Sequence, residues 1–138
     1  MDYGNYRIEH INELNSLPEP YYIEAAIENN EIVVNWFDPN NTERFFEFIT
    51  NTNNGIPDKI RIIRYGIDNP ELATKSILEY NGKYFIFSEV GSSGQPKTYY
   101  GNEITLYYHE PYEVWIYNLK TYDGESILVF SLFNISLK

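Results

Sequence analysis

The chain has 138 residues, no cysteine and a formal net charge of −10 at pH 7. Its length favours a single domain over residues 1–138 that buries a core without disulfides or metal staples. The negative charge repels phosphate and argues against a nucleic-acid partner, and no apolar stretch is long enough to span a membrane. The N-terminus also lacks the basic start and the apolar run of a signal peptide.

The first third of the chain carries weak signals. We expect residues 1–20 to be loosely attached to the domain, with a short helix over residues 8–17 that the following prolines end. Residues 21–26 are predicted to be extended. Residues 32–37 are β-branched and aromatic, which predicts a strand.

Residues 41–53 are predicted to form the main helix. Asn40 stands three positions before Glu43, the spacing of a capping box at a helix start. Phe45 and Phe48 recur at helical spacing and give the helix one aromatic face. A glycine and a proline after residue 53 then end it.

The rest of the chain alternates between β-rich runs and turn residues. Asn-Gly at residues 81–82 and Asp-Gly at residues 123–124 each separate two such runs, which predicts two hairpins. The predicted strands cover residues 59–67, 73–80, 83–90, 97–108, 113–121 and 126–133, with a bend at Gly101. The predicted fold class is α+β: a twisted antiparallel β-sheet with one main helix, at about residues 41–53, packed on one face.

Residues 32–90 also carry a recognisable order of motifs. The aromatic helix is followed by Asn-Gly, by Asp-Lys-Ile-Arg-Ile at residues 58–62, and by Leu-Glu-Tyr-Asn-Gly-Lys at residues 78–83. This order resembles a family of domains of unknown function found in lipoproteins of Gram-positive bacteria. The resemblance implies a lipid-anchored precursor on the extracellular face of the cell envelope, and no known activity. The chain lacks the family's lipid-attachment cysteine, and the alternative location is the cytoplasm.

Motifs for catalysis or metal binding are missing from the sequence. His10 and His109 are its two histidines, and we expect His109 to be an exposed turn residue. No nucleophile motif, no metal-ligand spacing and no calcium loop occurs, so we expect no cofactor and no metal. Arg61 is expected to face away from the main helix and to meet Glu79 or Glu89 across the strands.

Aromatic residues are concentrated in the last third of the chain. Because neighbouring residues on a strand point to opposite faces, both faces of this part of the sheet must carry aromatic side chains. One face can form core, and the other is either exposed or covered by the N-terminal segment or further helices. The candidate binding residues are Trp36, Tyr107, Trp115 and Tyr117.

These observations favour a non-enzymatic binding or interaction domain of the bacterial cell envelope with a protein partner. Its surface would combine exposed tyrosines with acidic residues of the N-terminal half, since residues 1–57 hold 10 acidic and 2 basic residues. The alternative is a cytosolic acidic inhibitor or immunity-type protein that binds a basic partner. A third hypothesis is a small hydrolase that uses dispersed carboxylates. The sequence leaves the oligomeric state open.

Overall fold

The computed structural model describes residues 4–35, 39–66, 73–91 and 95–133. Its elements are α1 (Tyr6–Asn15), α2 (Ile23–Glu28), β1 (Ile32–Val34), α3 (Thr42–Asn53), β2 (Asp58–Tyr65), β3 (Ala73–Tyr80), β4 (Phe85–Val90), β5 (Lys97–His109), the 3-10 turn η1 (Glu110–Tyr112), β6 (Val114–Thr121) and β7 (Ser126–Phe133). The strands form one sheet in chain order. β1 is parallel to β2, and the other neighbouring pairs are antiparallel.

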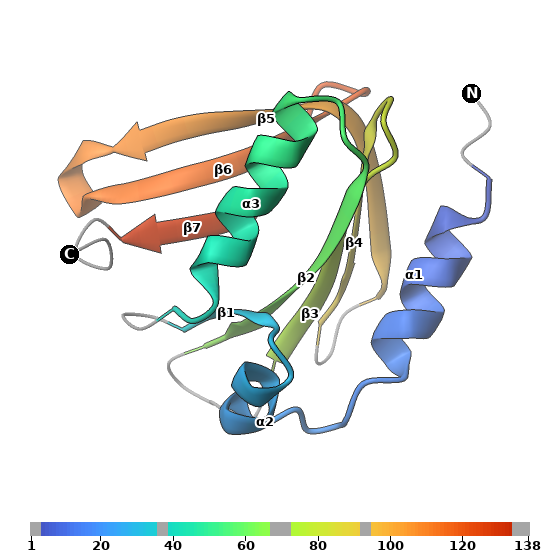
Figure 1. Ribbon diagram of the computed structural model, residues 1–138, viewed down its shortest axis with the longest axis vertical. Coiled ribbons are helices and arrows are strands. Elements are labelled where there is room, and N and C mark those ends of the chain that lie inside the picture. The colour runs from blue at the N-terminus through green and yellow to red at the C-terminus, as the bar shows by residue number, and fades with distance from the viewer. Residues whose placement is uncertain (1–3, 36–38, 67–72, 92–94, 134–138) are drawn as a thin grey trace.

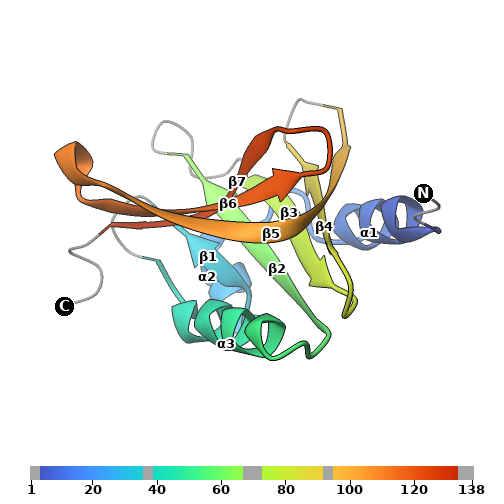
Figure 2. The same cartoon turned by 90° about the horizontal axis from the view of Figure 1, so that it is seen from above.

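The sheet is curled into a half-barrel, so that β1 and β7 approach each other (Figure 1). α3 covers the concave side of the sheet. α1 lies against β3 and β4 on the convex side, and α2 lies beside β1. Figure 2 shows α1 and α3 on different sides of β2–β4. The far half of the sheet, β5 to β7, is therefore covered on its concave side alone. No described helix lies on its convex side (Figure 2).

The concave core consists of alternate strand residues and the aromatic face of α3. Phe45 and Phe48 are fully buried there, together with Ile62 of β2 and Phe87 of β4. The ring of Phe45 stacks on Phe130 of β7 with a centroid distance of 4.1 Å. This packing joins the helix to the last strand and confirms the predicted aromatic face of the helix.

A smaller cluster is buried on the convex side. Val33 and Ile63 are register partners on β1 and β2, and both are fully buried against Tyr21 and Tyr65. The Tyr65 hydroxyl donates to the Tyr21 carbonyl at 2.6 Å, and burial is the first cause that raises the pKa of Tyr65 to about 12. Both faces of β1 are therefore covered, which explains its uninterrupted apolar sequence.

The predicted fold, a twisted antiparallel sheet with one main helix on one face, is wrong. The sheet is mixed and curled, and helices lie on both of its sides. The parallel pair follows from the order β1–α3–β2, because a crossover helix returns the second strand in the direction of the first. The prediction rested on the two antiparallel hairpins and left this crossover out.

Two local predictions also fail. Residues 21–26 are not extended, because residues 23–28 form α2. A helix of one and a half turns shows no periodicity in the sequence, and its start, Tyr-Ile, is typical of strands. The capping box is absent as well: Asn41 precedes α3 in the left-handed conformation and makes no cap hydrogen bond. Its amide instead donates to the Glu31 carbonyl at 2.8 Å, which ties the start of α3 to the turn before β1.

The hairpin predictions are confirmed. Gly82 and Gly124 take φ angles of 95° and 92° in the turns of the β3–β4 and β6–β7 hairpins. A bulge follows Gly101, where the bend was predicted. A Cβ atom on Gly101 would lie 2.1 Å from the Lys120 carbonyl oxygen, so this close approach of two strands requires glycine.

Candidate functional site

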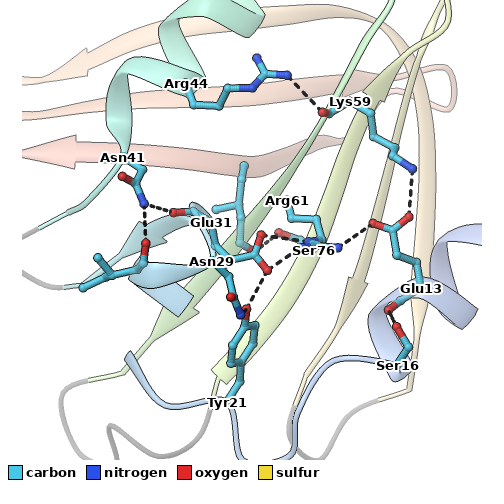
Figure 3. Close-up of polar contacts among 12 residues, drawn as sticks. Glu13, Ser16, Tyr21, Asn29, Glu31, Asn41, Arg44, Lys59, Arg61 and Ser76 are labelled. Carbon is cyan, nitrogen blue, oxygen red and sulfur yellow. Dashed lines mark hydrogen bonds and ion pairs between the residues drawn. The ribbon is translucent and has the colours of Figure 1, made fainter. Parts of the chain in front are cut away.

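Arg61 of β2 is the centre of a polar cluster on the convex side (Figure 3). Its Nε donates to both carboxylate oxygens of Glu31, at 2.9 and 3.1 Å, and its Nη1 donates to Glu13 at 3.2 Å. Lys59 Nζ donates to the other oxygen of Glu13 at 2.9 Å, and the Tyr21 hydroxyl donates to Glu31 at 3.0 Å. The cluster therefore joins three segments: helix α1, the turn that precedes β1, and strand β2.

The charges of this cluster satisfy one another. Glu31 is 4% exposed, so its carboxylate depends on these donors. Burial alone would raise the pKa of the Glu13 carboxyl, but Lys59 and Arg61 outweigh burial and lower that pKa. A general acid of a glycoside hydrolase needs a raised carboxyl pKa instead. Although the adjoining pocket measures about 280 Å³, we assign the cluster a role in stability.

The expected partners of Arg61 are wrong. Arg61 does face away from α3, but it stands opposite Ile77 in the register, so no carboxylate of β3 lies directly across from it. Glu89 instead accepts from Arg64 Nη2 at 3.2 Å, and Glu79 lies 2.7 Å from His10 Nε2. The carboxylates that bind Arg61 belong to Glu13 in α1 and to Glu31 in the turn before β1. The alternation of residues along the strands does not predict where these two segments lie.

The two histidines have different roles. His10 is buried between α1 and the sheet, with its Nδ1 2.8 Å from the Ser88 hydroxyl and its Nε2 on Glu79. His109 was expected to be an exposed turn residue, but it ends β5 and is partly buried. Its ring stacks on Tyr112 with a centroid distance of 5.0 Å and an interplanar angle of 11°. His109 therefore belongs to an aromatic cluster.

Asp58 fastens the start of β2 to α3. Its carboxylate accepts from Nη1 of Arg44 at 2.9 Å, from Nη2 of Arg44, and from the Asn51 amide at 3.0 Å. Burial alone would raise the pKa of the Asp58 carboxyl, but these hydrogen bonds outweigh burial and lower it.

Acid is therefore expected to weaken the fold through Asp58. Because its folded-state pKa lies below the unfolded value, the stabilisation is complete above about pH 5 and is lost as the pH falls through the folded pKa. Asp58→Asn should lower the free energy of unfolding by about 1–2 kcal/mol at neutral pH and flatten its fall between about pH 5 and pH 2. Urea unfolding across this range measures both effects. Glu28→Gln, at an exposed residue of α2, is the control, and equal pH slopes in the parent protein and both variants would contradict the assignment.

The predicted binding residues lie on different faces. Tyr107 is 55% exposed on the convex face of β5. Trp115 and Tyr117 of β6 point to the concave side, where Trp115 packs on Tyr108 with a centroid distance of 4.6 Å and Tyr117 packs on Phe45 at 4.8 Å. Trp36 lies outside the described residues. The structure thus leaves Tyr107 exposed on the convex face and places Trp115 and Tyr117 on the other face.

Apolar and aromatic side chains line the convex face of the far half of the sheet. We call this set the outward strip: Tyr107, His109, Tyr112, Ile116 and Leu128. Tyr107 stands opposite Ile116 in the register and contacts His109 with a centroid distance of 6.1 Å. Among the described residues no helix packs on this face, because α1 lies against β3 and β4 and α2 against β1 (Figure 2).

Tyr112 is the most exposed member of the strip, and it was not among the candidate binding residues of the sequence. It is 72% exposed and lies in η1, the turn between β5 and β6. Glu113 closes this turn in the left-handed conformation, with a φ angle of 51°, and its amide donates to the Glu110 carbonyl at 3.1 Å. A tyrosine beside a proline between two strands is the signal that could have identified it. Figure 1 shows this end of the β5–β6 hairpin extending beyond α3.

A groove of about 410 Å³ lies on the opposite, concave side of the same hairpin. Its apolar lining comes from α3, β3, β4, β5 and β6: Ile49, Tyr80, Phe85, Ile104, Leu106 and Tyr117. Burial raises the pKa of the Tyr117 hydroxyl. The groove places Tyr117 among core residues, away from the outward strip.

Comparisons with protein family models, curated protein sequences and solved structures found no match to this chain. In the part of the chain that the structure describes, no group of three or more His, Asp or Glu side chains could hold a metal ion. No described helix is long and apolar enough to cross a membrane. Which of the two features is the functional site, the polar cluster or the outward strip, must therefore be judged from their own geometry.

Proposed function

We propose that this chain is a non-enzymatic binding domain that docks a protein partner on the outward strip. The observation that carries the proposal is the exposure of Tyr107 on β5 and of Tyr112 in the adjoining turn η1. No described helix packs on this face of the sheet. Exposed tyrosines clustered with aliphatic side chains are the composition that protein-binding surfaces favour. The polar cluster around Arg61 offers no comparable surface, because its ions already bind one another.

The rigidity of the hairpin supports the same proposal. Its concave side is packed against the core through Tyr117, and Trp115 packs on Tyr108 within the hairpin, so these contacts support the backbone that carries the strip. A partner that binds a preformed surface loses less conformational entropy on binding. The cell envelope as the location belongs to this proposal, and its support is the resemblance of residues 32–90.

Site-specific photo-crosslinking in the source cells tests the proposal. A benzoylphenylalanine residue at Tyr112 is expected to form a discrete adduct with one protein, because this ring would lie inside the interface. The matched control is the same residue at Tyr22, which is 51% exposed at the start of α2. Fractionating the cells before electrophoresis also tests the location. Absence of an adduct at Tyr112, or equal adducts at both positions, would overturn the proposal.

The cytosolic acidic inhibitor is the second candidate, and the charge distribution favours it. Residues 1–57 have a net charge of −8, from 10 acidic and 2 basic residues. Adducts at Tyr112 confined to the cytosol would support this candidate over the envelope protein. Either location requires the same kind of surface, a face that receives another protein.

A further inference from the structure

The β5–β6 hairpin is acidic as well as aromatic. Residues 98–119 contain Glu103, Glu110 and Glu113 and neither lysine nor arginine. Glu103 stands opposite Lys120, at the end of the hairpin far from η1. The other two glutamates flank Tyr112 in the turn. Negative charge is thus concentrated where the aromatic side chains are most exposed.

The carboxylates of the turn carry no counter-charge within the described part of the chain. Glu110 and Glu113 are exposed, and neither takes part in the ion pairs of the described residues. Lys120 is six register steps from the pair His109–Val114, which is about 20 Å along the strands. At this separation salt screens most of the interaction. By contrast, Glu13 and Glu31 near the polar pocket are both paired with cations.

The aromatic rings at the turn leave a free π face. His109 covers one face of Tyr112, and the rest of the ring contributes to its 72% exposure. Tyr107 contacts the same histidine edge-on, with an interplanar angle of 69°. An aromatic face beside a carboxylate suits a guanidinium group, which stacks on the ring while its N–H groups bind the carboxylate.

The turn places Glu110 and Glu113 close to Tyr112 along the chain. Glu110 and Glu113 begin and follow η1, and the hydrogen bond between their backbones closes it. A left-handed conformation is uncommon for glutamate, and here it turns the chain from η1 into β6. The three groups are therefore presented together.

We propose that the partner surface docked on the outward strip presents arginine side chains to Glu110, Tyr112 and Glu113. This inference rests on the proposed function and specifies its partner. The complementary charges would steer association, and the tyrosine rings would hold the guanidinium groups once docked.

A peptide titration tests the inference. The probe is an acetylated and amidated peptide of about eight residues that alternates Gly and Arg, and its neutral control replaces arginine with citrulline, which keeps the shape. The labelled chain is followed by two-dimensional NMR at low salt. We expect the largest shifts at residues 107–113 with the arginine peptide and none with the citrulline peptide. Equal binding of both peptides, no binding, or shifts centred on residues 1–57 would overturn the inference.

Two sets of variants separate charge from ring chemistry. Replacing both Glu110 and Glu113 with Gln should weaken binding of the arginine peptide about fivefold, as expected for two exposed ion pairs. Replacing Glu24 and Glu28 of α2 with Gln makes the same charge change elsewhere and should leave the affinity unchanged. Tyr112→Leu should weaken binding about threefold while Tyr112→Phe retains it, because both variants lack the hydroxyl but only the Leu variant lacks the π face. Equal affinities across either set would contradict the assignment.

Failure of this inference can be told apart from failure of the proposed function. A partner crosslinked at Tyr112 whose adduct is unaffected when Glu110 and Glu113 become Gln would keep the binding domain and reject the arginine surface. Arginine-peptide binding at the turn without a cellular adduct would reject the binding domain. A doubled molar mass that requires Tyr107 would identify a second copy of this chain as the occupant, and would overturn the arginine surface.

Discussion

Phe48→Ala is expected to lower the free energy of unfolding by about 3–5 kcal/mol. Phe48 is fully buried on α3 in the concave core and packs near Phe85, with ring centroids 6.3 Å apart. Truncation removes the transfer free energy of the ring and leaves a cavity between the helix and the sheet. Because β1, α3 and the strands are fixed around it, the cavity cannot fully collapse.

Urea unfolding of the variant measures this loss. The matched control is Phe46→Ala, since Phe46 is the neighbouring aromatic residue of the same helix but lies on its exposed side. We expect the control to cost about 1 kcal/mol or less. A cost below about 1 kcal/mol for Phe48→Ala would mean that this face of α3 does not pack on the sheet.

Arg61→Ala is expected to cost about 3 kcal/mol, at the low end for a broken buried ion pair because the guanidinium is partly exposed. The variant leaves the buried carboxylate of Glu31 with the Tyr21 hydroxyl as its remaining side-chain donor among the described residues. It also removes the Arg61 donor from Glu13, which keeps its ion pair with Lys59, so α1 loses one of its contacts with β2.

Two further variants make this result specific. Arg7→Ala removes an exposed cation of α1 that takes part in none of the ion pairs of the described residues, and should change stability by about 0.5 kcal/mol or less. The double variant Arg61→Met with Glu31→Gln should lose less stability than Arg61→Ala, because no buried charge is then left unpaired. If Arg61→Ala and Arg7→Ala were equally mild, the polar cluster would not hold the three segments together.

Local signals in the sequence predicted most of the elements, but not their arrangement. The aromatic periodicity of α3 and the glycine turns of two hairpins depend on nearby residues, so the sequence shows them directly. The parallel pairing of β1 and the half-barrel curl depend on contacts between distant segments. Phe45, for example, meets Phe130 although 85 residues separate them in the chain (130 − 45).

The candidate site was predicted in part for the same reason. The sequence required aromatic side chains on both faces of β5 and β6, but the assignment of each residue to a face depends on the register. Bulges after Gly101 and at Tyr117 shift that register by one residue. In the resulting register Tyr107 pairs with Ile116 on the convex side, and Trp115 and Tyr117 lie on the concave side. Tyr112 was not a candidate binding residue, because it lies in the connecting turn.

Strands β2 to β7 pair in the order in which they occur, so each of these pairings closes a loop within the next few residues. Short closures cost little chain entropy, and contacts of this kind are compatible with rapid folding. β1 differs, since its pairing with β2 spans the whole of α3. Among the described strand pairings, the one that spans a helix is therefore also the pairing that brings the aromatic face of α3 onto the sheet. The chain entropy lost in that closure is offset by the burial of Phe45 and Phe48 between α3 and the sheet.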